Sequence, residues 1–506
     1  MTEPLISVRG LRVTAGTAVL IDAADLEIGA GEIVTLFGPS GAGKTTLATA
    51  LAGIPVTGTT VTGQVRRRAA IRVGYLPQDA AATLNPARRI GTALGELARL
   101  RARRLGLPRP GRAQLRRRLA ATLAAAAFDL DATDLDALAR RYPFEFSGGE
   151  RARLALAQVL TFDPDVLVMD EPTVGLDPIA RATLLTGLTA LRDTGTAVVL
   201  VTHDAAAVEQ VGDRTLFVRD GRVHTTGDLP EVPAMGERAP RPPATPVLRL
   251  REVSVTHRGA PTLHGIDLEL HPGELLAMIG VSGAGKSTIG RCIAGLVTPA
   301  GGEIQLDAQR LPPLRRRGKA QIAAVQYVWQ ESAASFDPRR TVLDQVAATA
   351  IRLRGTDRGA ATSQAITLLT ELGIEETQAR RYPAGLSGGQ LQRAALARAL
   401  GAQPRVLVCD EITTALDQPL AQRVLDHLDD YRHRHGAAIL SISHDLRGQL
   451  DRADRVAVVD AGRIVDLGTP AELRSRPAGT IPAGLLAVDA RPTRAAGRIE
   501  ACIPRT

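Results

Sequence analysis

The chain of 506 residues has few aromatic side chains and few cysteines. Aromatic residues make up 3% of the sequence, which argues against a stacking platform for single-stranded nucleic acid. The three cysteines, Cys292, Cys409 and Cys502, lie far apart and form no CxxC pair. This spacing argues against an iron–sulfur centre and against a disulfide framework, and it fits a reducing compartment.

Long apolar runs are also missing. No stretch of 18 or more apolar residues occurs, so we expect no segment that spans a membrane by itself. The first residues lack a basic start followed by an apolar run, so we expect no signal peptide. The formal net charge of +9 comes mostly from arginine. It is compatible with nucleic acid or anionic lipid, and equally with the general surface of an arginine-rich protein.

The sequence is organised around one glycine-rich stretch, Gly38-Pro39-Ser40-Gly41-Ala42-Gly43-Lys44-Thr45-Thr46. It follows the apolar run 33–37, typical of a buried strand, and precedes 47–52, typical of a helix. This context predicts a phosphate-binding loop, in which backbone N–H groups and a helix N-terminus face one anion. Lys44 is then placed to reach the β- and γ-phosphates, and the Thr45 hydroxyl to bind Mg²⁺.

The same pattern returns as Gly280-Val281-Ser282-Gly283-Ala284-Gly285-Lys286-Ser287-Thr288, after the apolar run 275–279. The two lysines are 242 residues apart, Ser147 and Ser387 as well as Asp170 and Asp410 are 240 apart, and His203 and His444 are 241 apart. A chance glycine turn would not recur in this way, so the sequence predicts a tandem duplication of a domain of about 240 residues. We expect a first domain at 1–229, a proline-rich linker at 230–246, a second domain at 247–480 and a C-terminal tail at 481–506.

Two apolar runs, 166–169 and 406–409, each end in a pair of carboxylates. The pairs are Asp170-Glu171 and Asp410-Glu411. Such runs predict buried parallel strands with acids at the carboxyl edge of the sheet, where α/β proteins place ligands. We expect the first carboxylate of each pair to hold Mg²⁺ through water and the second to orient the attacking water.

A glutamine and a histidine follow further predicted strands in both copies. Gln78 and Gln330 are each preceded by a tyrosine three residues earlier, and His203 and His444 each end an apolar run. Alone, such a glutamine is weak evidence and such a histidine is more often structural. Their recurrence at matching positions favours Gln78 and Gln330 as ligands of Mg²⁺ and water, and the histidines as contacts of the γ-phosphate.

A serine and two glycines precede a predicted helix in each copy. The segments are Ser147-Gly148-Gly149-Glu150 and Ser387-Gly388-Gly389-Gln390, with the helices expected at 151–160 and 391–400. An ordinary serine cap explains one such turn. It does not explain two turns that each lie 23 residues before an acidic strand end, so we expect a second anion site at each.

Basic residues gather in residues 88–140 of the first copy, which we expect to be helical with a break near 107–111. A solvated helical face and contact with lipid headgroups both remain open for this stretch. The second copy has a less basic helical insert at about 339–380, and a basic run, Arg315 to Lys319, that we expect in a loop.

This ordered set of motifs, present twice and covering nearly the whole chain, resembles two nucleotide-binding domains of an ATP-binding-cassette (ABC) protein. The resemblance implies an α/β fold of two tandem P-loop ABC ATPase domains. Each would have a RecA-like parallel-sheet core, an antiparallel β subdomain and an α-helical subdomain. It also implies ATP and Mg²⁺ as cofactors, and a head-to-tail pseudo-dimer within one chain. One ATP would lie between the Lys44 loop and the Ser387 turn, the other between the Lys286 loop and the Ser147 turn.

The family usually stacks an aromatic residue on adenine about two dozen residues before the phosphate loop. His257 stands at this position in the second copy and Ala15 in the first. Residues 78–86 and 330–338 resemble the corresponding loop of the oligopeptide, dipeptide and nickel importers, although the C-terminal cysteine cluster of many members is missing.

The resemblance therefore implies an ATPase of an importer for peptides, or for nickel or another chelated metal. Its partners would be two transmembrane permease subunits and an extracytoplasmic substrate-binding protein, without nucleic acid, and its place the cytoplasmic face of the plasma membrane. A tandem sugar-importer ATPase, an exporter ATPase and a ribosome-associated ABC-F protein are the alternatives. The last is disfavoured because its long charged linker is replaced here by a short proline-rich one.

Overall fold

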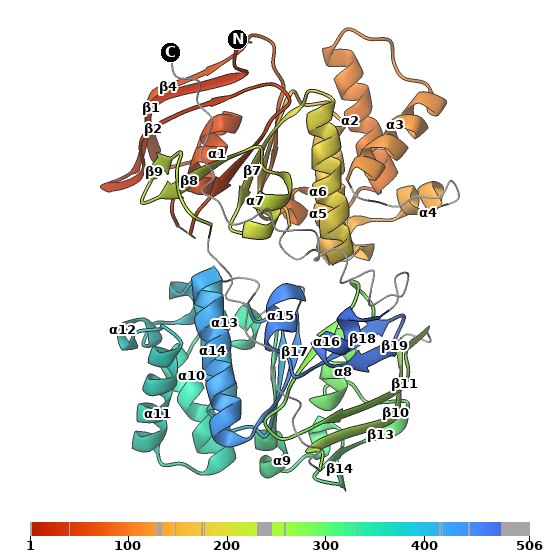
Figure 1. Cartoon of the computed structure of the whole chain (residues 1–506), viewed down its shortest axis with the longest axis vertical. Coiled ribbons are helices and arrows are strands. Elements are labelled where there is room, and N and C mark those ends of the chain that lie inside the picture. Colours follow the sequence, from red (N-terminus) through yellow and green to blue (C-terminus); the bar gives the residue numbers. More distant parts are fainter. Residues whose placement is uncertain are drawn as a thin grey trace. The chain divides into compact units, whose positions relative to one another are not determined.

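The computed structural model describes residues 3–476 with internal gaps. The gaps are residues 40, 127, 129–133, 147, 174–175, 177, 230–244, 258–259, 331, 414–415, 417 and 444–445. The chain divides into two compact units near residue 232 (Figure 1). Most of the predicted linker and the whole predicted tail lie outside the described residues.

Unit one contains a six-stranded sheet in the order β5-β6-β7-β3-β8-β9. Neighbouring strands are parallel, except that β8 and β9 are antiparallel. The strands are β3 (Ile33–Phe37), β5 (Val73–Leu76), β6 (Val166–Asp170), β7 (Ala197–Thr202), β8 (Arg214–Arg219) and β9 (Arg222–His224). A second, antiparallel sheet in the order β2-β1-β4 consists of β1 (Ile6–Ala15), β2 (Ala18–Ile28) and β4 (Thr59–Arg67).

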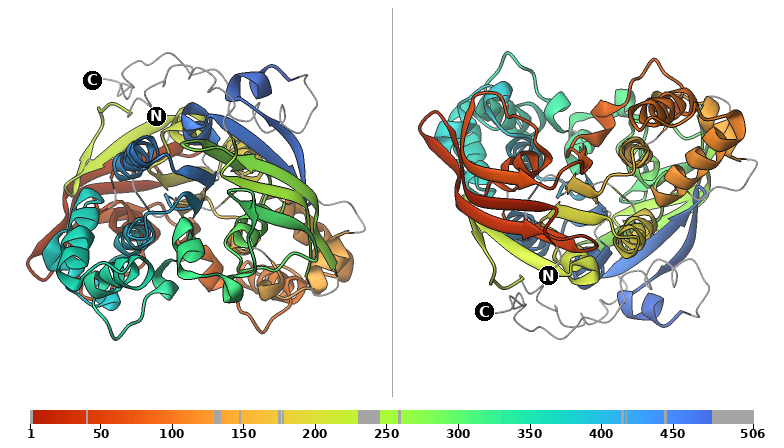
Figure 2. Two further views of the ribbon diagram at one scale, coloured as in Figure 1. Left: turned by 90° about the horizontal axis from the view of Figure 1, so that it is seen from below. Right: turned by 90° about the horizontal axis from the view of Figure 1, so that it is seen from above.

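The helices of unit one follow the order expected for alternating strands and helices. They are α1 (Lys44–Ala52), α2 (Ile90–Arg104), α3 (Arg112–Ala125), α4 (Asp134–Arg140), α5 (Gly148–Leu160), α6 (Pro178–Asp193) and α7 (Ala205–Val211). In Figures 1 and 2 the antiparallel sheet and the helices α2 and α3 lie on opposite sides of the central strands.

Unit two repeats this plan. Its main sheet has the order β15-β16-β17-β12-β18-β19, parallel except for the last pair, and its antiparallel sheet the order β11-β10-β13-β14. The strands are β10 (Leu248–His257), β11 (Ala260–Leu270), β12 (Leu275–Ile279), β13 (Gly301–Leu306), β14 (Gln309–Arg310), β15 (Val325–Val328), β16 (Val406–Asp410), β17 (Ala438–Ile442), β18 (Arg455–Asp460) and β19 (Arg463–Gly468). The helices are α8 (Lys286–Ile293), α9 (Lys319–Ala324), α10 (Val342–Thr349), α11 (Arg358–Glu371), α12 (Glu376–Ala379), α13 (Gly388–Leu400), α14 (Gln418–His435), α15 (Leu446–Arg452) and α16 (Pro470–Arg474).

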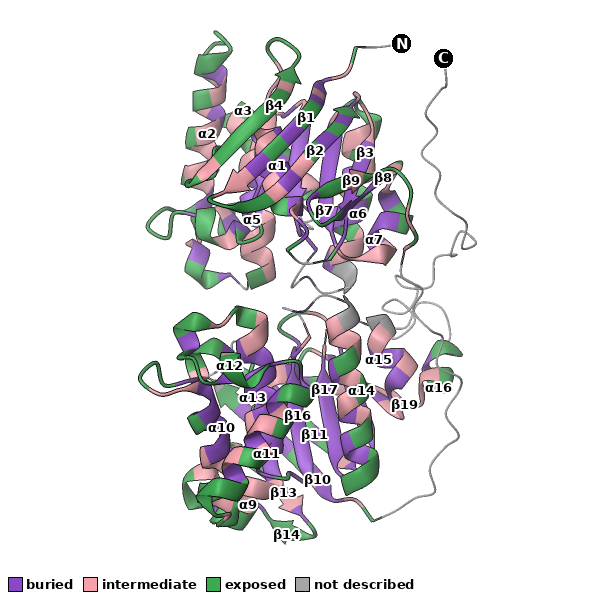
Figure 3. Cartoon of the chain, turned by 90° about the vertical axis from the view of Figure 1, so that its left-hand side faces the viewer, coloured by how far each residue is buried: buried purple, intermediate pink, exposed green. Residues whose placement is uncertain are grey.

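The central strands are buried on both faces, which Figure 3 shows as purple ribbons in each unit. Successive side chains of a strand point to opposite faces. In β16, Val406 and Val408 therefore join the core shared with the antiparallel sheet and α8. Leu407 and Cys409 join the core shared with the helical part. The strand that ends in Asp410 thus has a packed core on each side.

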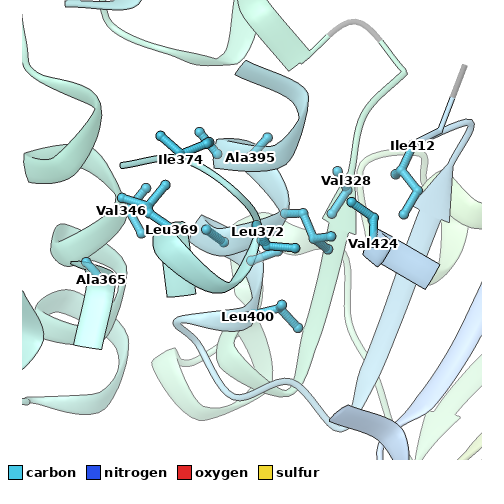
Figure 4. Close-up of a cluster of buried hydrophobic side chains, with 14 of the residues drawn as sticks. Val328, Val346, Ala365, Leu369, Leu372, Ile374, Ala395, Leu400, Ile412 and Val424 are labelled. Atoms are coloured by element: carbon cyan, nitrogen blue, oxygen red, sulfur yellow. The ribbon is translucent and has the colours of Figure 1, made fainter. Parts of the chain in front are cut away.

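The second of these cores ties the helical part of unit two to the sheet (Figure 4). Val346 on α10, Leu369 on α11 and Leu400 on α13 belong to the same buried cluster as Val328 of β15. Unit one has an equivalent cluster, to which Leu94 of α2 and Leu167 of β6 belong. Burial of apolar surface in these clusters holds each helical part against its own sheet.

The α/β fold of two cassette-like units, each with a parallel sheet and antiparallel strands, confirms the predicted fold class. The helices after the two serine turns begin three residues earlier than predicted, because the glycines themselves form part of the first turn.

The prediction that the basic run from Arg315 to Lys319 lies in a simple loop is wrong. Residues 314–316 form a 3₁₀ turn and α9 starts at Lys319, while Arg317 is buried and donates to the Pro312 and Ile293 carbonyls at 2.9 and 2.8 Å.

Candidate active site

The glycine-rich loop of unit one connects β3 to α1, and Lys44 is the first residue of the helix. The Lys44 side chain is buried, and its Nζ donates to the carbonyls of Gly38 and Pro39 at 2.8 and 2.9 Å. The ammonium is thereby held inside the loop, beside the N-terminus of α1. Positive charge at this position suits a phosphate. Ser40 lies outside the described residues.

Unit two forms the same loop between β12 and α8. Lys286 Nζ donates to the carbonyls of Gly280 and Val281 at 2.8 and 2.9 Å. Gly280 has no room for a side chain, because a Cβ atom would lie 2.1 Å from the Val459 carbonyl oxygen. The glycine at the start of the loop is therefore required by a close approach of two strands.

The acid pair of unit one stands at the carboxyl end of β6. Glu171 has a φ of 51°, a left-handed conformation that is rare for a side chain of this kind, and its N–H donates to the Val201 carbonyl at 2.9 Å. His203, just after β7, places Nδ1 at 2.9 Å from Glu171 Oε1. This hydrogen bond raises the pKa of His203. Backbone strain of this kind persists where the surrounding structure enforces it, typically at functional sites.

The carboxylate of Asp170 is buried, and neither of its oxygens has a hydrogen-bond partner among the described residues. Burial raises its pKa, while the Thr45 hydroxyl and the Lys44 ammonium act in the opposite direction. A buried carboxylate without partners, next to a hydroxyl, is a set of hard oxygen ligands suited to Mg²⁺.

The acid pair of unit two has more contacts. Asp410 accepts a hydrogen bond from the Ser287 hydroxyl at 3.1 Å on Oδ1, and another from the Tyr327 hydroxyl on Oδ2. Burial raises the pKa of Asp410, and both hydroxyl contacts oppose this. Glu411, with a φ of 54°, accepts from the Gln330 side-chain amide. The residues predicted for magnesium and water thus lie together here, except that His444 is outside the described residues.

Gln78 differs from Gln330. Both glutamines are exposed, but within the described part of unit one Gln78 makes no hydrogen bond to Asp170 or Glu171, whereas Gln330 donates to Glu411. The structure therefore brings the predicted glutamine to the acid pair in unit two and not in unit one.

The serine turn of unit two forms a capping box. Ser387 Oγ accepts from the N–H of Gln390 at 3.3 Å, and Gln390 Oε1 accepts from the N–H of Ser387 at 2.8 Å. The turn therefore begins α13 as an ordinary cap does, with Gly388 exposed. In unit one Gly148, Gly149 and Glu150 open α5, and Ser147 lies outside the described residues.

The two positions expected near adenine both end an antiparallel strand. Ala15 ends β1 and pairs with Ala18, and His257 ends β10 and pairs with Ala260. The backbone register is therefore the same in both units, and the His257 side chain lies outside the description.

Sequence reasoning missed the role of Tyr327 and of Gln392. Tyr327 reaches Asp410 as described, and its ring contacts that of Trp329 with centroids 5.0 Å apart. Gln392 on α13 is buried and donates to the Trp329 carbonyl at 3.0 Å. The recurrence of a tyrosine three residues before each glutamine was an available signal for the first contact. No pattern marked the second.

Two phosphate loops, each beside an acid pair on a parallel sheet, define the class of nucleotide-hydrolysing P-loop proteins. The sequence pattern of the family described as "ABC transporter" matches residues 21–174 and 263–414. The chain therefore belongs to this family, and it binds and hydrolyses ATP in a reaction coupled to transport. Across the described residues, no helix is both long and apolar enough to cross a bilayer.

Similar proteins include the oligopeptide transport ATP-binding protein OppD of Mycobacterium tuberculosis, 29% identical over 94% of this chain and 96% of that protein. The glutathione import ATP-binding protein GsiA of Escherichia coli K12 is 33% identical over 65% of this chain and 62% of its own length. A solved ATP-binding cassette with bound ADP and Pi is 25% identical and gives a TM-score of 0.41 over 44% of this chain and 98% of that chain.

Proposed function

We propose that the chain is the ATP-hydrolysing, energy-coupling subunit of an importer for peptides, or for nickel or another chelated metal. The observation that carries the proposal is the duplicated loop and acid pair in a chain that is similar to OppD over 94% of its length. The names of OppD and GsiA favour a peptide among these substrates. Nickel or a chelated metal rests on the resemblance of the 78–86 and 330–338 loops alone.

The catalytic step is proposed to be attack of a water oxygen on the γ-phosphorus of ATP, which breaks the bond from this phosphorus to the β–γ bridging oxygen and releases ADP and phosphate. Lys44 and Lys286 would bind the phosphates, and Glu171 and Glu411 would orient the water and take its proton. His203 is 2.9 Å from Glu171, and this contact would hold the carboxylate in place. His203 and His444 are proposed to contact the γ-phosphate, and His444 also to hold Glu411 as His203 holds Glu171.

The residues present fit a magnesium ion. In unit one the unpaired carboxylate of Asp170 and the hydroxyl of Thr45 would hold it, with Gln78 reaching it after a movement of its loop. In unit two the ligands would be Ser287, Asp410 and Gln330. The Ser287 hydroxyl already donates to Asp410, and the Gln330 amide to Glu411. When bound, such an ion neutralises charge on the phosphate oxygens.

Each site is proposed to be completed by the other domain, with domain limits at 1–229 and 247–480. The phosphate loop of one domain would face the serine turn of the other, so Ser147 to Glu150 and Ser387 to Gln390 would each contact a γ-phosphate. His257 would lie against adenine at the second site, and Ala15 leaves the first without this contact. ATP would close the pseudo-dimer, and product release would reopen it.

The partners proposed are two transmembrane permease subunits, docked near the Gln78 and Gln330 loops, and an extracytoplasmic substrate-binding protein. The chain would then lie at the cytoplasmic face of the plasma membrane. A sugar-importer or exporter ATPase would use other permeases, and an ABC-F protein would use the ribosome instead.

The test is a native pull-down of a tagged Glu171→Gln/Glu411→Gln double variant, trapped with ATP before gentle solubilisation of membranes. Two multi-span permeases with a peptide-binding protein would support the proposal. A metal-binding protein in that place would assign nickel or a chelated metal, and a sugar-binding protein or none at all would favour the other transporters. Ribosomal proteins without a permease would overturn it. The wild type without ATP is the control for non-specific capture.

A further inference from the structure

The α2–α3 hairpin of unit one has an unusual charge. Residues 97–126 contain nine arginines and no acidic residue. Three of the arginines are paired within the unit: Arg101 and Arg118 with Asp163, and Arg116 with Asp136. The other six have no carboxylate partner in the described part of the chain; they are Arg99, Arg103, Arg104, Arg109, Arg112 and Arg117.

The loop between α2 and α3 exposes two leucine side chains to solvent. Leu105 and Leu107 are 45% and 50% exposed, and Leu100 on α2 is 38% exposed. The end of α2 has the hydrogen bonds of a Schellman motif: the Leu107 N–H donates to the Ala102 carbonyl at 2.8 Å, and the Gly106 N–H to the Arg103 carbonyl at 3.2 Å. Gly106 has the positive φ of 64° that this motif requires. The tip is therefore ordered in advance, so a contact made there loses little conformational entropy.

The apolar tip and the free arginines lie together. The arginines follow the last turn of α2, the loop and the first turns of α3, and the loop joins the two helices at their outer end (Figure 1). Figure 3 shows this end of the hairpin mostly in green, the colour of exposed residues. The opposite side of α2, with Leu94 and Ala98, is buried against the rest of the unit. One side of the hairpin is thus packed and the other combines positive charge with two leucines.

We propose that the tip of the α2–α3 hairpin binds the surface of an anionic lipid bilayer, with Leu105 and Leu107 at the boundary between headgroups and acyl chains. Arginine charge and a small apolar wedge are the combination that binds such surfaces. An RNA or DNA partner would satisfy the charge and leave the leucines in water, and aromatic side chains for stacking are absent from residues 97–126. The inference requires no permease and does not depend on the importer assignment.

The duplicate in unit two supplies an internal control. Its hairpin loop between α10 and α11 contains Asp357, which caps α11 by accepting from the Ala360 N–H at 3.0 Å. Arg354 is engaged by Gln364 Oε1 and by the Gly401 carbonyl, at 2.9 and 3.2 Å. Among the described residues, the same position in the fold therefore has fewer exposed arginines without a partner, Arg352 and Arg358, and it also has the carboxylate of Asp357, so we expect it not to bind lipid.

The experiment is a titration of the purified full-length chain with unilamellar vesicles, either pure phosphatidylcholine or with about one third phosphatidylglycerol. Each basic residue near an anionic surface contributes about fivefold. The tip variant Arg103→Gln/Arg104→Gln/Arg109→Gln should therefore bind anionic vesicles about 100-fold more weakly. The matched control Arg315→Gln/Arg352→Gln/Arg358→Gln removes three exposed charges elsewhere and should bind like the wild type. Circular dichroism and basal ATPase rate establish that each variant is folded.

A second variant, Leu105→Ser/Leu107→Ser, keeps the charge and separates insertion from simple attraction. It should weaken binding, and the binding that remains should be lost in 0.5 M salt, since screening removes attraction between exposed charges. Equal losses in the tip and control variants would overturn the proposal, because net charge alone would then explain binding. Absence of vesicle binding by the wild type would overturn it too, as would tip-dependent binding of a single-stranded RNA with none to vesicles.

Discussion

The two units carry the same motifs, but the first carboxylate of the acid pair has different hydrogen-bond partners in each unit. Among the described residues of unit one, neither oxygen of the buried Asp170 has a hydrogen-bond partner within normal distance, whereas Asp410 of unit two accepts from Ser287 and Tyr327. The tyrosine is present in both units, as Tyr75 and Tyr327. Burial raises the pKa of Tyr75 to about 12 without a hydrogen bond to the acid. A shared motif therefore does not guarantee shared contacts around it.

The difference extends to the helix that follows the serine turn. In unit two, Gln392 of α13 donates to the Trp329 carbonyl, one residue before Gln330. The counterpart of Gln392 in unit one is Ala152, which has no amide to donate to the carbonyl of Pro77, the counterpart of Trp329. The glutamine loop of unit two is thus hydrogen-bonded to its acid pair and to α13, and the described residues of the loop in unit one make no corresponding hydrogen bonds, although Ala80 and Leu84 pack in the same core as α5.

The largest effect is expected from the glutamates. Glu171→Gln and Glu411→Gln should each slow hydrolysis at their own site, and the double variant should lose turnover by about 10²- to 10⁴-fold, since a general base contributes this much. Phosphate release measures the rate, and retention of ATP binding in the double variant shows that the loss is chemical. Full activity in either single variant would mean that one unit alone carries turnover, and an active double variant would contradict the assignment.

Tyr327→Phe removes a hydrogen bond that orients Asp410. We expect the Mg²⁺ concentration for half-maximal hydrolysis to rise about tenfold, as for other partners of metal ligands. The measurement uses a Glu171→Gln background so that only the second site turns over. Tyr75→Phe in a Glu411→Gln background is the matched control and should change the requirement by less than about twofold. Equal shifts in the two backgrounds would remove the distinction between the units.

Trp329, the single tryptophan of the chain, should report on unit two alone. It is 37% exposed and its ring lies 5.6 Å from the Arg291 guanidinium, so a movement of the Gln330 loop changes its surroundings. We expect Mg-ATP to change its fluorescence in the wild type and in Lys44→Ala, and to leave Lys286→Ala unchanged. A flat signal in the wild type, with ATP binding shown independently, would argue against movement of this loop.

The smallest effect concerns His427 on α14, where unit one has Gly187. Burial lowers the pKa of His427 below its ordinary value. Below pH 6.5 the unfolded chain therefore binds a proton that the folded unit does not, so stability falls as the pH decreases. We expect the urea midpoint of the unit-two transition to decrease modestly from pH 7.5 to 5.5. The variant His427→Gln should lose this part of the pH dependence of the urea midpoint. A pH profile identical to that of the wild type would show that the histidine does not contribute.

The motifs predicted most of the fold and part of the site, for a physical reason. A phosphate loop such as the one at Lys44 needs local sequence that fits a strand, a glycine turn and a helix, so the sequence predicts β3 and its counterpart β12 with the right bounds. The helix α1 begins at Lys44, three residues before the predicted 47–52, because the end of the loop already forms its first turn. The contact between Gln392 and the Trp329 carbonyl joins residues 63 positions apart through a backbone atom. Such a contact leaves no residue pattern on the acceptor side, because every residue has a backbone carbonyl whatever its side chain.

The strand order has a consequence for synthesis of the chain. Every strand of the first pair of sheets comes from residues 6–224, and every strand of the second pair from residues 248–468. Within the described residues, no sheet combines strands from both halves of the chain. The first unit can therefore finish folding while the ribosome is still translating the second. Two units this similar could otherwise exchange strands, and completing one before the other exists protects the chain from that error.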